Sequence, residues 1–230
     1  MKNVAQYHAL SNLFRYPREG YKKRVNSCAI LLKQYYPEAY QSFLPFLEII
    51  KHKTLFEIEE LFGQTFHIQA ICYLDVGYVL FGEDYKRGEF LVQIKNEQAK
   101  VNNECGEELA DNLPNILTLM ELLEDKEFLG ELAVRVMIPA LKLMLKEFET
   151  SRMALKTKVR KKKQKVIIQE DMKNKNAYQY VIQTALQILE LDFADVSYDV
   201  IEVKPDLTSA FLPNCGTCAT EHEPAKITDK

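Results

Sequence analysis

The sequence has no tryptophan, and among its 230 residues it has only eight glycines and eight prolines. A turn-rich β fold needs many such residues, so their scarcity favours long helices joined by short connections. No apolar run approaches the roughly 20 residues that a membrane-spanning helix needs. The start of the chain shows no charged segment followed by an apolar one, so we expect no secretory signal and a cytoplasmic location.

Cysteine is also sparse: the five cysteines are scattered and odd in number, which is not the disulfide framework of a secreted protein. Cys215 and Cys218 form a Cys-x-x-Cys motif, and His222 follows four residues later. Together they offer three metal ligands, whereas a structural zinc site usually needs four. We therefore predict neither a metal nor another cofactor, and we keep Cys215, Cys218 and His222 as the alternative.

Charge is distributed unevenly along the chain. Residues 151–165 carry eight basic and no acidic side chains, so the rest of the chain holds 22 basic and 33 acidic residues, a net charge of −11. Clustered lysine and arginine can bind nucleic acid or an anionic membrane surface. An adaptor that works through 151–165 is therefore one functional hypothesis. We favour a solvated connection, because no aromatic residues are interleaved, and we expect no nucleic-acid partner and no membrane insertion.

Apolar residues recur at helical spacing through most of the chain. Thr54 and Glu57 have the spacing of a capping box, and Pro139 falls inside a long apolar pattern that it should kink. We predict an all-α fold, a single bundle of about eight to nine helices over residues 1–192, with a charged basic connection at 151–175 and a mostly mobile, acidic, cysteine-containing tail at 193–230. The predicted helices lie at about 3–14, 21–35, 40–50, 54–66, 70–81, 85–101, 113–123, 128–148 and 177–191.

Two helix ends, a lone arginine and a capped helix start fall close together between residues 75 and 114. Asp75 and Tyr78 share a helix face, and Tyr78 and Phe81 are candidates for the floor of a groove, although such residues also form cores. Arg87 can clamp a peptide carboxylate or carbonyl, or it can fix the loop by pairing with a neighbouring acid such as Glu83, Asp84 or Asp111. The predicted peptide-binding residues are Asp75, Tyr78, Phe81, Gly82, Arg87, Gly88, Asp111, Leu113 and Pro114.

Asp75 beside an aromatic floor suits a basic peptide, including a twin-arginine segment, or it is a solvated charge. Gly82 stands where a helix end needs a residue that tolerates a left-handed backbone, and Asp111 or Asn112 can cap the helix that starts at Leu113 and Pro114. The sequence shows no Ser/His/Asp set, no glycine-rich phosphate loop and no paired-carboxylate motif. We predict no catalytic residues and no enzyme activity.

Several motifs in this region and around it follow one another in a recognisable order and spacing. They are Leu10-Ser11-Asn12-Leu13-Phe14-Arg15-Tyr16-Pro17, Leu61-Phe62, Thr65-Phe66, Tyr78-Val79-Leu80-Phe81-Gly82, Lys86-Arg87-Gly88 with Leu91, Asp111-Asn112-Leu113-Pro114 with Leu117 and Leu122-Leu123, and Pro139-Ala140-Leu141. Over residues 4–190 this series resembles the NarJ group of redox-enzyme maturation chaperones. That group is also called the delta subunit family of respiratory nitrate reductases and is related to the TorD/DmsD chaperones.

The resemblance implies a helical bundle with a chaperone role and no chemistry of its own. Members of the family bind the newly made catalytic (alpha) subunit of a molybdenum enzyme in the cytoplasm, often through its N-terminal segment. They hold that subunit open until the molybdopterin guanine dinucleotide cofactor is inserted. The expected partner is therefore the catalytic subunit of a molybdoenzyme related to nitrate reductase.

Overall fold

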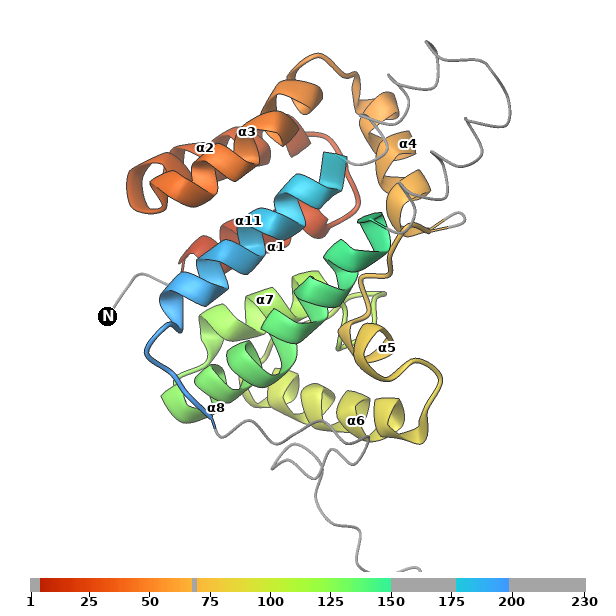
Figure 1. Ribbon diagram of the computed structural model, residues 1–230. Coiled ribbons are helices and arrows are strands. Elements are labelled where there is room, and N and C mark those ends of the chain that lie inside the picture. The colour runs from red at the N-terminus through yellow and green to blue at the C-terminus, as the bar shows by residue number, and fades with distance from the viewer. Residues whose placement is uncertain (1–4, 68–69, 150–176, 199–230) are drawn as a thin grey trace, which may run out of the picture. The chain divides into compact units, whose positions relative to one another are not determined.

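The computed structural model describes residues 5–67, 70–149 and 177–198, which all belong to one compact unit, residues 1–199. Apart from one isolated backbone bridge, every regular element in these ranges is helical, so the predicted all-α fold is confirmed (Figure 1). The elements are α1 (Ala5–Phe14), α2 (Tyr21–Tyr35), α3 (Pro37–Lys51), α4 (Leu55–Phe66), α5 (Val76–Phe81), α6 (Tyr85–Lys100), α7 (Leu113–Leu122), α8 (Lys126–Glu131), η1 (Leu132–Met137), a helical segment at 138–149, and α11 (Ala177–Asp192).

Some of the earlier hypotheses fall outside the described residues. These are the basic segment 151–165 within the predicted connection 151–175, and the candidate ligands Cys215, Cys218 and His222. In the ranges that are described, no helix is long and apolar enough to cross a membrane.

Short polar side chains start several of these helices. The Thr54 hydroxyl accepts from the Glu57 amide at 3.3 Å, while the Glu57 carboxylate accepts from the Thr54 amide at 2.7 Å, so the predicted capping box is confirmed. The side chains of Asp84 and Asp125 likewise accept backbone N–H groups at the starts of α6 and α8. Such caps satisfy N–H groups that have no partner within the helix.

The helix predicted at 128–148 changes its winding before Pro139. α8 passes into the π-helical turn η1, and helical winding resumes at Ile138, whose N–H reaches back five residues to the Ala133 carbonyl. Proline has no N–H and clashes with the carbonyl of the preceding turn, so the wider π turn accommodates it without ending the helix.

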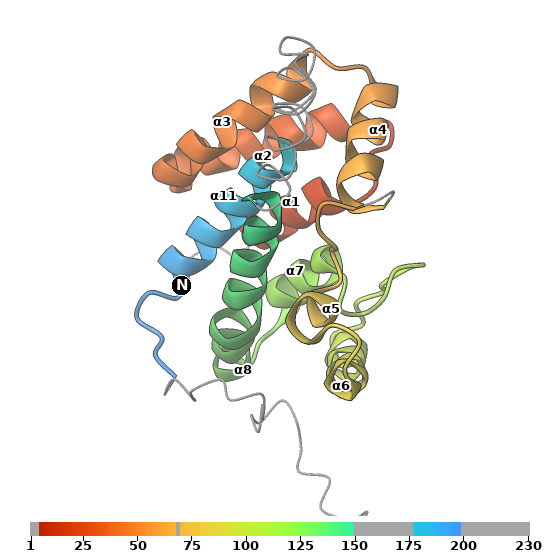
Figure 2. The same ribbon diagram turned by 45° about the vertical axis from the view of Figure 1, so that its right-hand side comes forward.

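The late helix α11 completes the hydrophobic core of the unit. It lies along α3 and beside α1, as the views of Figures 1 and 2 agree, which confirms that this late helix docks on the bundle. Tyr178 of α11 is fully buried among Phe46, Phe62 and Phe66, with ring centroids 4.9–5.5 Å from its own. Its hydroxyl is 3.0 Å from that of Tyr21. Each buried aromatic contributes a large apolar area, so this cluster holds α2, α3, α4 and α11 together.

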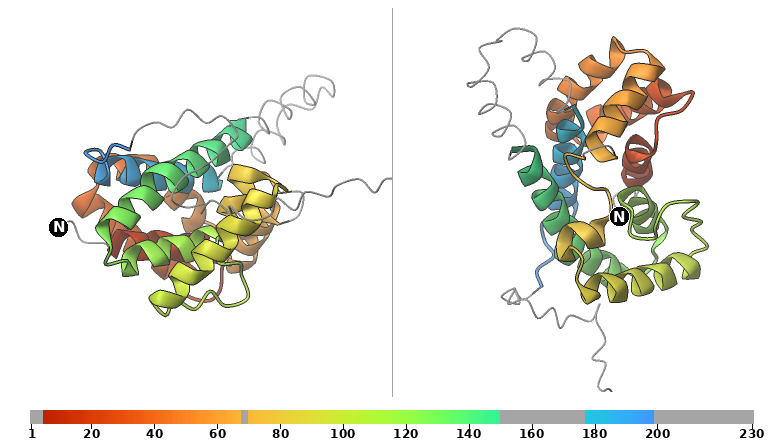
Figure 3. Two further views of the ribbon diagram at one scale, coloured as in Figure 1. Left: turned by 90° about the horizontal axis from the view of Figure 1, so that it is seen from below. Right: turned by 90° about the vertical axis from the view of Figure 1, so that its right-hand side faces the viewer.

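The helix predicted at 70–81 is wrong over its first half, because α5 begins only at Val76. The Ile71 N–H bonds to the Thr65 carbonyl at 2.8 Å, and the Leu74 carbonyl accepts from the Leu113 N–H at 2.9 Å. These backbone groups bond outside the helical pattern, so residues 70–75 form a non-helical link that bends at Ile71, Cys72 and Leu74. The link connects α4, beside α2 and α3, to α5 and α6 at the other end of the unit (Figure 3).

The first residues of the predicted tail belong to the packed unit. The Tyr198 hydroxyl donates to the Glu127 carbonyl at 2.8 Å, and the Arg135 guanidinium lies 5.0 Å from the Tyr198 ring centroid. Residues 193–198 therefore contact the body of the protein.

Candidate functional site

A backbone bridge between Asp75 and Asn112 joins the start of α5 to the start of α7. The Val76 N–H donates to the Asp111 carbonyl at 3.0 Å, next to the bond between Leu113 and Leu74. Motifs 37 residues apart in the sequence thereby meet in space. Asp75 itself is the N-cap of α5 and not a residue within a helix, so the shared helix face predicted for Asp75 and Tyr78 is wrong.

The Asp75 carboxylate is already occupied on both oxygens. Oδ1 accepts from the Asn112 amide at 3.1 Å, and Oδ2 accepts from the Arg87 guanidinium at 3.4 Å. The same guanidinium lies 5.1 Å from the centroid of the Tyr78 ring, a cation–π distance. Arg87 therefore pairs with an acid, as one of its two alternatives expected, but the acid is Asp75 and not Glu83, Asp84 or Asp111.

Asp111 is buried directly behind this pair. Its side chain is fully inaccessible, and Oδ2 accepts from the Gly77 N–H at 2.9 Å, while Oδ1 has no hydrogen-bond partner among the residues that the structure describes. Burial and the nearby Asp75 carboxylate raise the pKa of Asp111 to about 6, against the lowering effects of the Gly77 N–H and of Arg87. The Asp111 carboxyl therefore anchors the first turn of α5 and does not face solvent.

The other predicted site residues surround this anchor. Tyr78 is half-buried against Tyr73, at a centroid distance of 4.7 Å, and Phe81 packs on Phe90 at 5.7 Å. Leu113 and Pro114 are buried in the first turn of α7. Gly82 ends α5 with φ +63° and ψ −134°, a region that essentially only glycine occupies, and Gly88 is exposed in the first turns of α6.

An open pocket of about 670 Å³ lies beside this cluster, on the other side of the 70–75 link. Of the nine predicted residues, only Asp75 and Pro114 line it; Tyr78 and Phe81 do not. The pocket is formed by the end of α1 and the following turn, by Arg24 of α2, by the end of α4, by the link, by the loop between α6 and α7, and by the first turn of α7. These segments include the Arg15-Tyr16-Pro17 and Leu61–Phe66 motifs.

Aromatic rings form one part of the pocket. Tyr16 is 45% exposed, and its ring stacks on His67 with an interplanar angle of 12° and a centroid distance of 6.3 Å. Both rings meet Phe62 edge-on, at 5.6 and 5.3 Å. Since Phe62 also belongs to the Tyr178 cluster, the pocket floor rests on the core.

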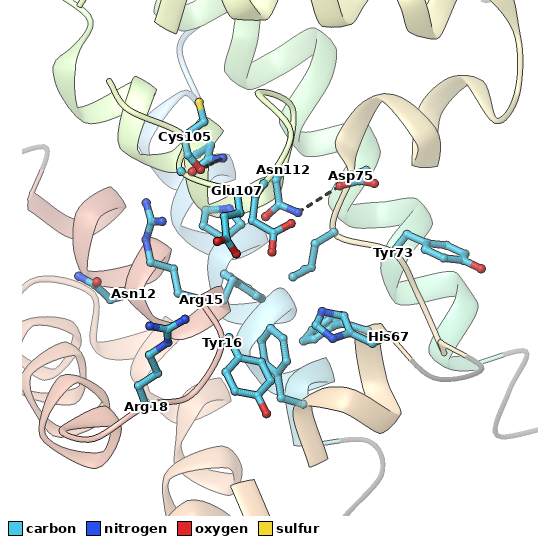
Figure 4. Close-up of a pocket in the computed structure, with 18 of the residues that line it drawn as sticks. Asn12, Arg15, Tyr16, Arg18, His67, Tyr73, Asp75, Cys105, Glu107 and Asn112 are labelled. Atoms are coloured by element: carbon cyan, nitrogen blue, oxygen red, sulfur yellow. Dashed lines mark hydrogen bonds between the residues drawn. The ribbon is translucent and has the colours of Figure 1, made fainter. Parts of the chain in front are cut away.

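Charged side chains occupy two sides of the same pocket. Figure 4 shows Arg15 and Arg18 on one side and Asp75 with Tyr73 on the other, with Glu107 between them. Arg24 lines it as well, and so does Glu108 next to Glu107. A pocket with an aromatic floor and charges of both signs can hold several polar and apolar side chains at once.

The sequence analysis did not predict Arg15, Arg18, Arg24 or the 105–108 loop as part of a binding site. The motif that contains Arg15 and Tyr16 carries part of the family resemblance, but neither residue is among the predicted site residues. The available signal was three arginines within ten residues, at 15, 18 and 24, with Glu19 the only acid among them. The Cys105–Glu108 side gave no comparable signal. The α6–α7 loop is held at the pocket by the bridge at Asn112 and by the Asn115 amide, which donates to the Cys105 and Leu109 carbonyls at 3.3 and 2.9 Å.

Together these features define an all-α protein with an open, mixed-charge pocket where several segments of the chain meet. In the part of the chain that the structure describes, no group of three or more His, Cys, Asp or Glu side chains could hold a metal ion. Comparisons with protein-family models, with curated proteins and with solved structures find no match for this chain.

Proposed function

We propose that this protein is a cytoplasmic assembly chaperone that binds the cofactor-free catalytic subunit of a molybdenum oxidoreductase related to nitrate reductase. It assists insertion of the molybdenum cofactor and carries out no reaction itself. The proposal rests on the resemblance of residues 4–190 to the NarJ group.

The observation that carries the proposal is the position of the pocket relative to the motifs. Tyr16, Phe62 and Pro114 come from three separate motifs of the resemblance, and all three line the pocket. Ligand pockets commonly span about 300–1,000 Å³, so about 670 Å³ accommodates a few side chains of a bound segment. A client segment is an occupant of this size and mixed polarity.

Release of the client follows from differential binding. A chaperone that binds the open, cofactor-free state more tightly than the finished enzyme shifts its client toward the open state, and folding around the cofactor withdraws the bound segment. This role needs a pocket that grips an unfolded segment, and it needs no general acid, base or nucleophile.

The test is co-expression with the catalytic subunit of a molybdenum oxidoreductase from the same organism. We expect the molybdenum content of the purified subunit, measured by mass spectrometry, to fall several-fold when the chaperone is omitted. Tyr16→Ala should reproduce much of this loss, whereas Tyr35→Ala, which removes an exposed tyrosine outside the pocket, should not. Full molybdenum content without the chaperone would refute the proposal.

A further inference from the structure

The pocket has a strongly cationic side, formed by Arg15, Arg18 and Arg24, and none of these three side chains pairs with a carboxylate of the residues that the structure describes. Arg15 donates to the Thr118 hydroxyl at 3.3 Å, and Arg24 donates to the Glu19 carbonyl at 3.4 Å. Arg18 is exposed, and its side chain makes no hydrogen bond or ion pair with any residue that the structure describes. Guanidinium groups bind carboxylates strongly through paired N–H donors, so three of them around one pocket form a site for a carboxylate.

The carboxylates that line the pocket differ in whether other residues of the protein already bind them. Asp75 is held by Arg87 and Asn112, so it has little capacity left for a cationic ligand. Glu107 and Glu108 are exposed on the α6–α7 loop. They repel an acidic group and thereby favour its placement at the arginines, which gives a bound segment a direction.

The exposed ring of Tyr16 follows Arg15 directly in the sequence, and Figure 4 shows Tyr16 between Arg18 and His67. An apolar or aromatic side chain can pack against this stacked pair. The arginine side of the pocket and its aromatic floor can therefore bind two neighbouring side chains of a polypeptide, one acidic and one apolar.

We propose that the pocket recognises a client segment in which an aspartate or glutamate, held by Arg15, Arg18 and Arg24, lies within a few residues of an apolar or aromatic side chain. This inference rests on the proposed function, because it takes the occupant to be a polypeptide. The sequence analysis expected Asp75 to favour a basic peptide. The structure favours an acidic one instead, because Arg87 and Asn112 already bind the Asp75 carboxylate.

The experiment selects ligands from a phage-displayed library of random dodecapeptides, using the purified full-length chain. We expect the selected peptides to be enriched in Asp or Glu near Phe, Tyr, Leu or Met. A selected peptide, made synthetically with a fluorescent label, should bind Arg18→Glu about tenfold more weakly, because a charge-assisted contact is replaced by repulsion. Arg15→Gln should weaken binding in the same direction.

Lys33→Gln is the matched control, since Lys33 is an exposed cation of α2 outside the pocket, and it should leave the affinity unchanged. Repeating the selection on Arg18→Glu should shift the enriched residue from acidic to Lys or Arg, a change that a merely structural role of Arg18 does not produce. Enrichment of basic residues by the wild-type protein, no enrichment, or equal affinity of Arg18→Glu would each overturn the inference. Because this experiment uses no molybdenum enzyme, its outcome is independent of the co-expression test.

Discussion

Gly77 is the most tightly confined small residue of the α5–α7 junction. A Cβ there would lie 2.7 Å from Asp111 Oδ2 and 2.8 Å from the Phe90 ring, closer than atoms can approach. Since both neighbours are buried, Gly77→Ala should lower the free energy of unfolding by about 1–3 kcal/mol, as measured by urea denaturation.

Gly63 provides the matched control, because it lies inside α4 and a Cβ there would meet nothing within 4 Å. Gly63→Ala should raise the stability by up to about 1 kcal/mol, because alanine favours the helix and restricts the unfolded chain. If Gly77→Ala proved as well tolerated as Gly63→Ala, Asp111 would not be held against the α5 backbone as described.

Asp111 should give the protein a recognisable pH dependence. Its pKa is raised to about 6 in the folded state, above the value of about 3.9 for an unfolded chain, so the folded state binds the proton more tightly. The unfolding free energy contributed by this group therefore falls as pH rises from about 4 to about 6, by up to about 3 kcal/mol. Urea unfolding of wild type and Asp111→Asn across this range should show a shallower decline for the variant. Parallel curves would mean that Asp111 does not titrate in this window.

At the scale of elements, Asp75 ties α5, α6 and α7 together through one carboxylate. Arg87 and Asp75 are each partly exposed, which weakens their attraction, so a double-mutant cycle with Arg87→Gln and Asp75→Asn should give a coupling free energy of about 0.5–1 kcal/mol. Such coupling supports a loop-fixing role for Arg87. A coupling free energy of zero would leave the guanidinium available as a peptide clamp, the other alternative.

Most helices could be predicted because their signals are local. The Thr54–Glu57 capping box, the prolines at 37 and 114, and the apolar spacing of α11 each act within a few residues. The error at 70–75 has a different cause. Cys72, Leu74 and Val76 are buried while Tyr73 is exposed, but this alternation is only five residues long. The backbone partners that keep the segment out of a helix lie outside it, at Thr65, Asp111 and Leu113.

The candidate site was less predictable than the helices for the same reason. The predicted site residues lie near both ends of the bridge, but most of their side chains are buried or bound by other residues of the protein. The pocket beside it draws Tyr16, His67 and Glu107 from three different segments. Only tertiary contacts bring these three residues together, so the pocket cannot be predicted from helix periodicity.

At the scale of the whole unit, the pocket depends on how firmly the early and late helices are joined. Phe62 lies both in the pocket and against Tyr178 of α11, so loosening α11 would disturb the pocket floor. At the other end of α11, the Asp192 carboxylate accepts from Gln6 at 2.8 Å, from Tyr7 at 2.9 Å and from Tyr36 at 2.9 Å. Burial and this carboxylate raise the pKa of both tyrosines, so both hydroxyls stay protonated donors.

Tyr36→Phe removes one of these donors while keeping the buried ring in place. Because the acceptor is charged and the bond joins the α2–α3 turn to α11, we expect a loss of about 1–2 kcal/mol in the unfolding free energy, measured by urea denaturation followed by circular dichroism. Tyr35→Phe, at the neighbouring exposed position, should change it by less than about 0.5 kcal/mol. The loss should appear as a shift of one cooperative transition, because the clamp joins parts of a single unit. A separate early transition in Tyr36→Phe would show instead that α11 unfolds apart from the helices it covers.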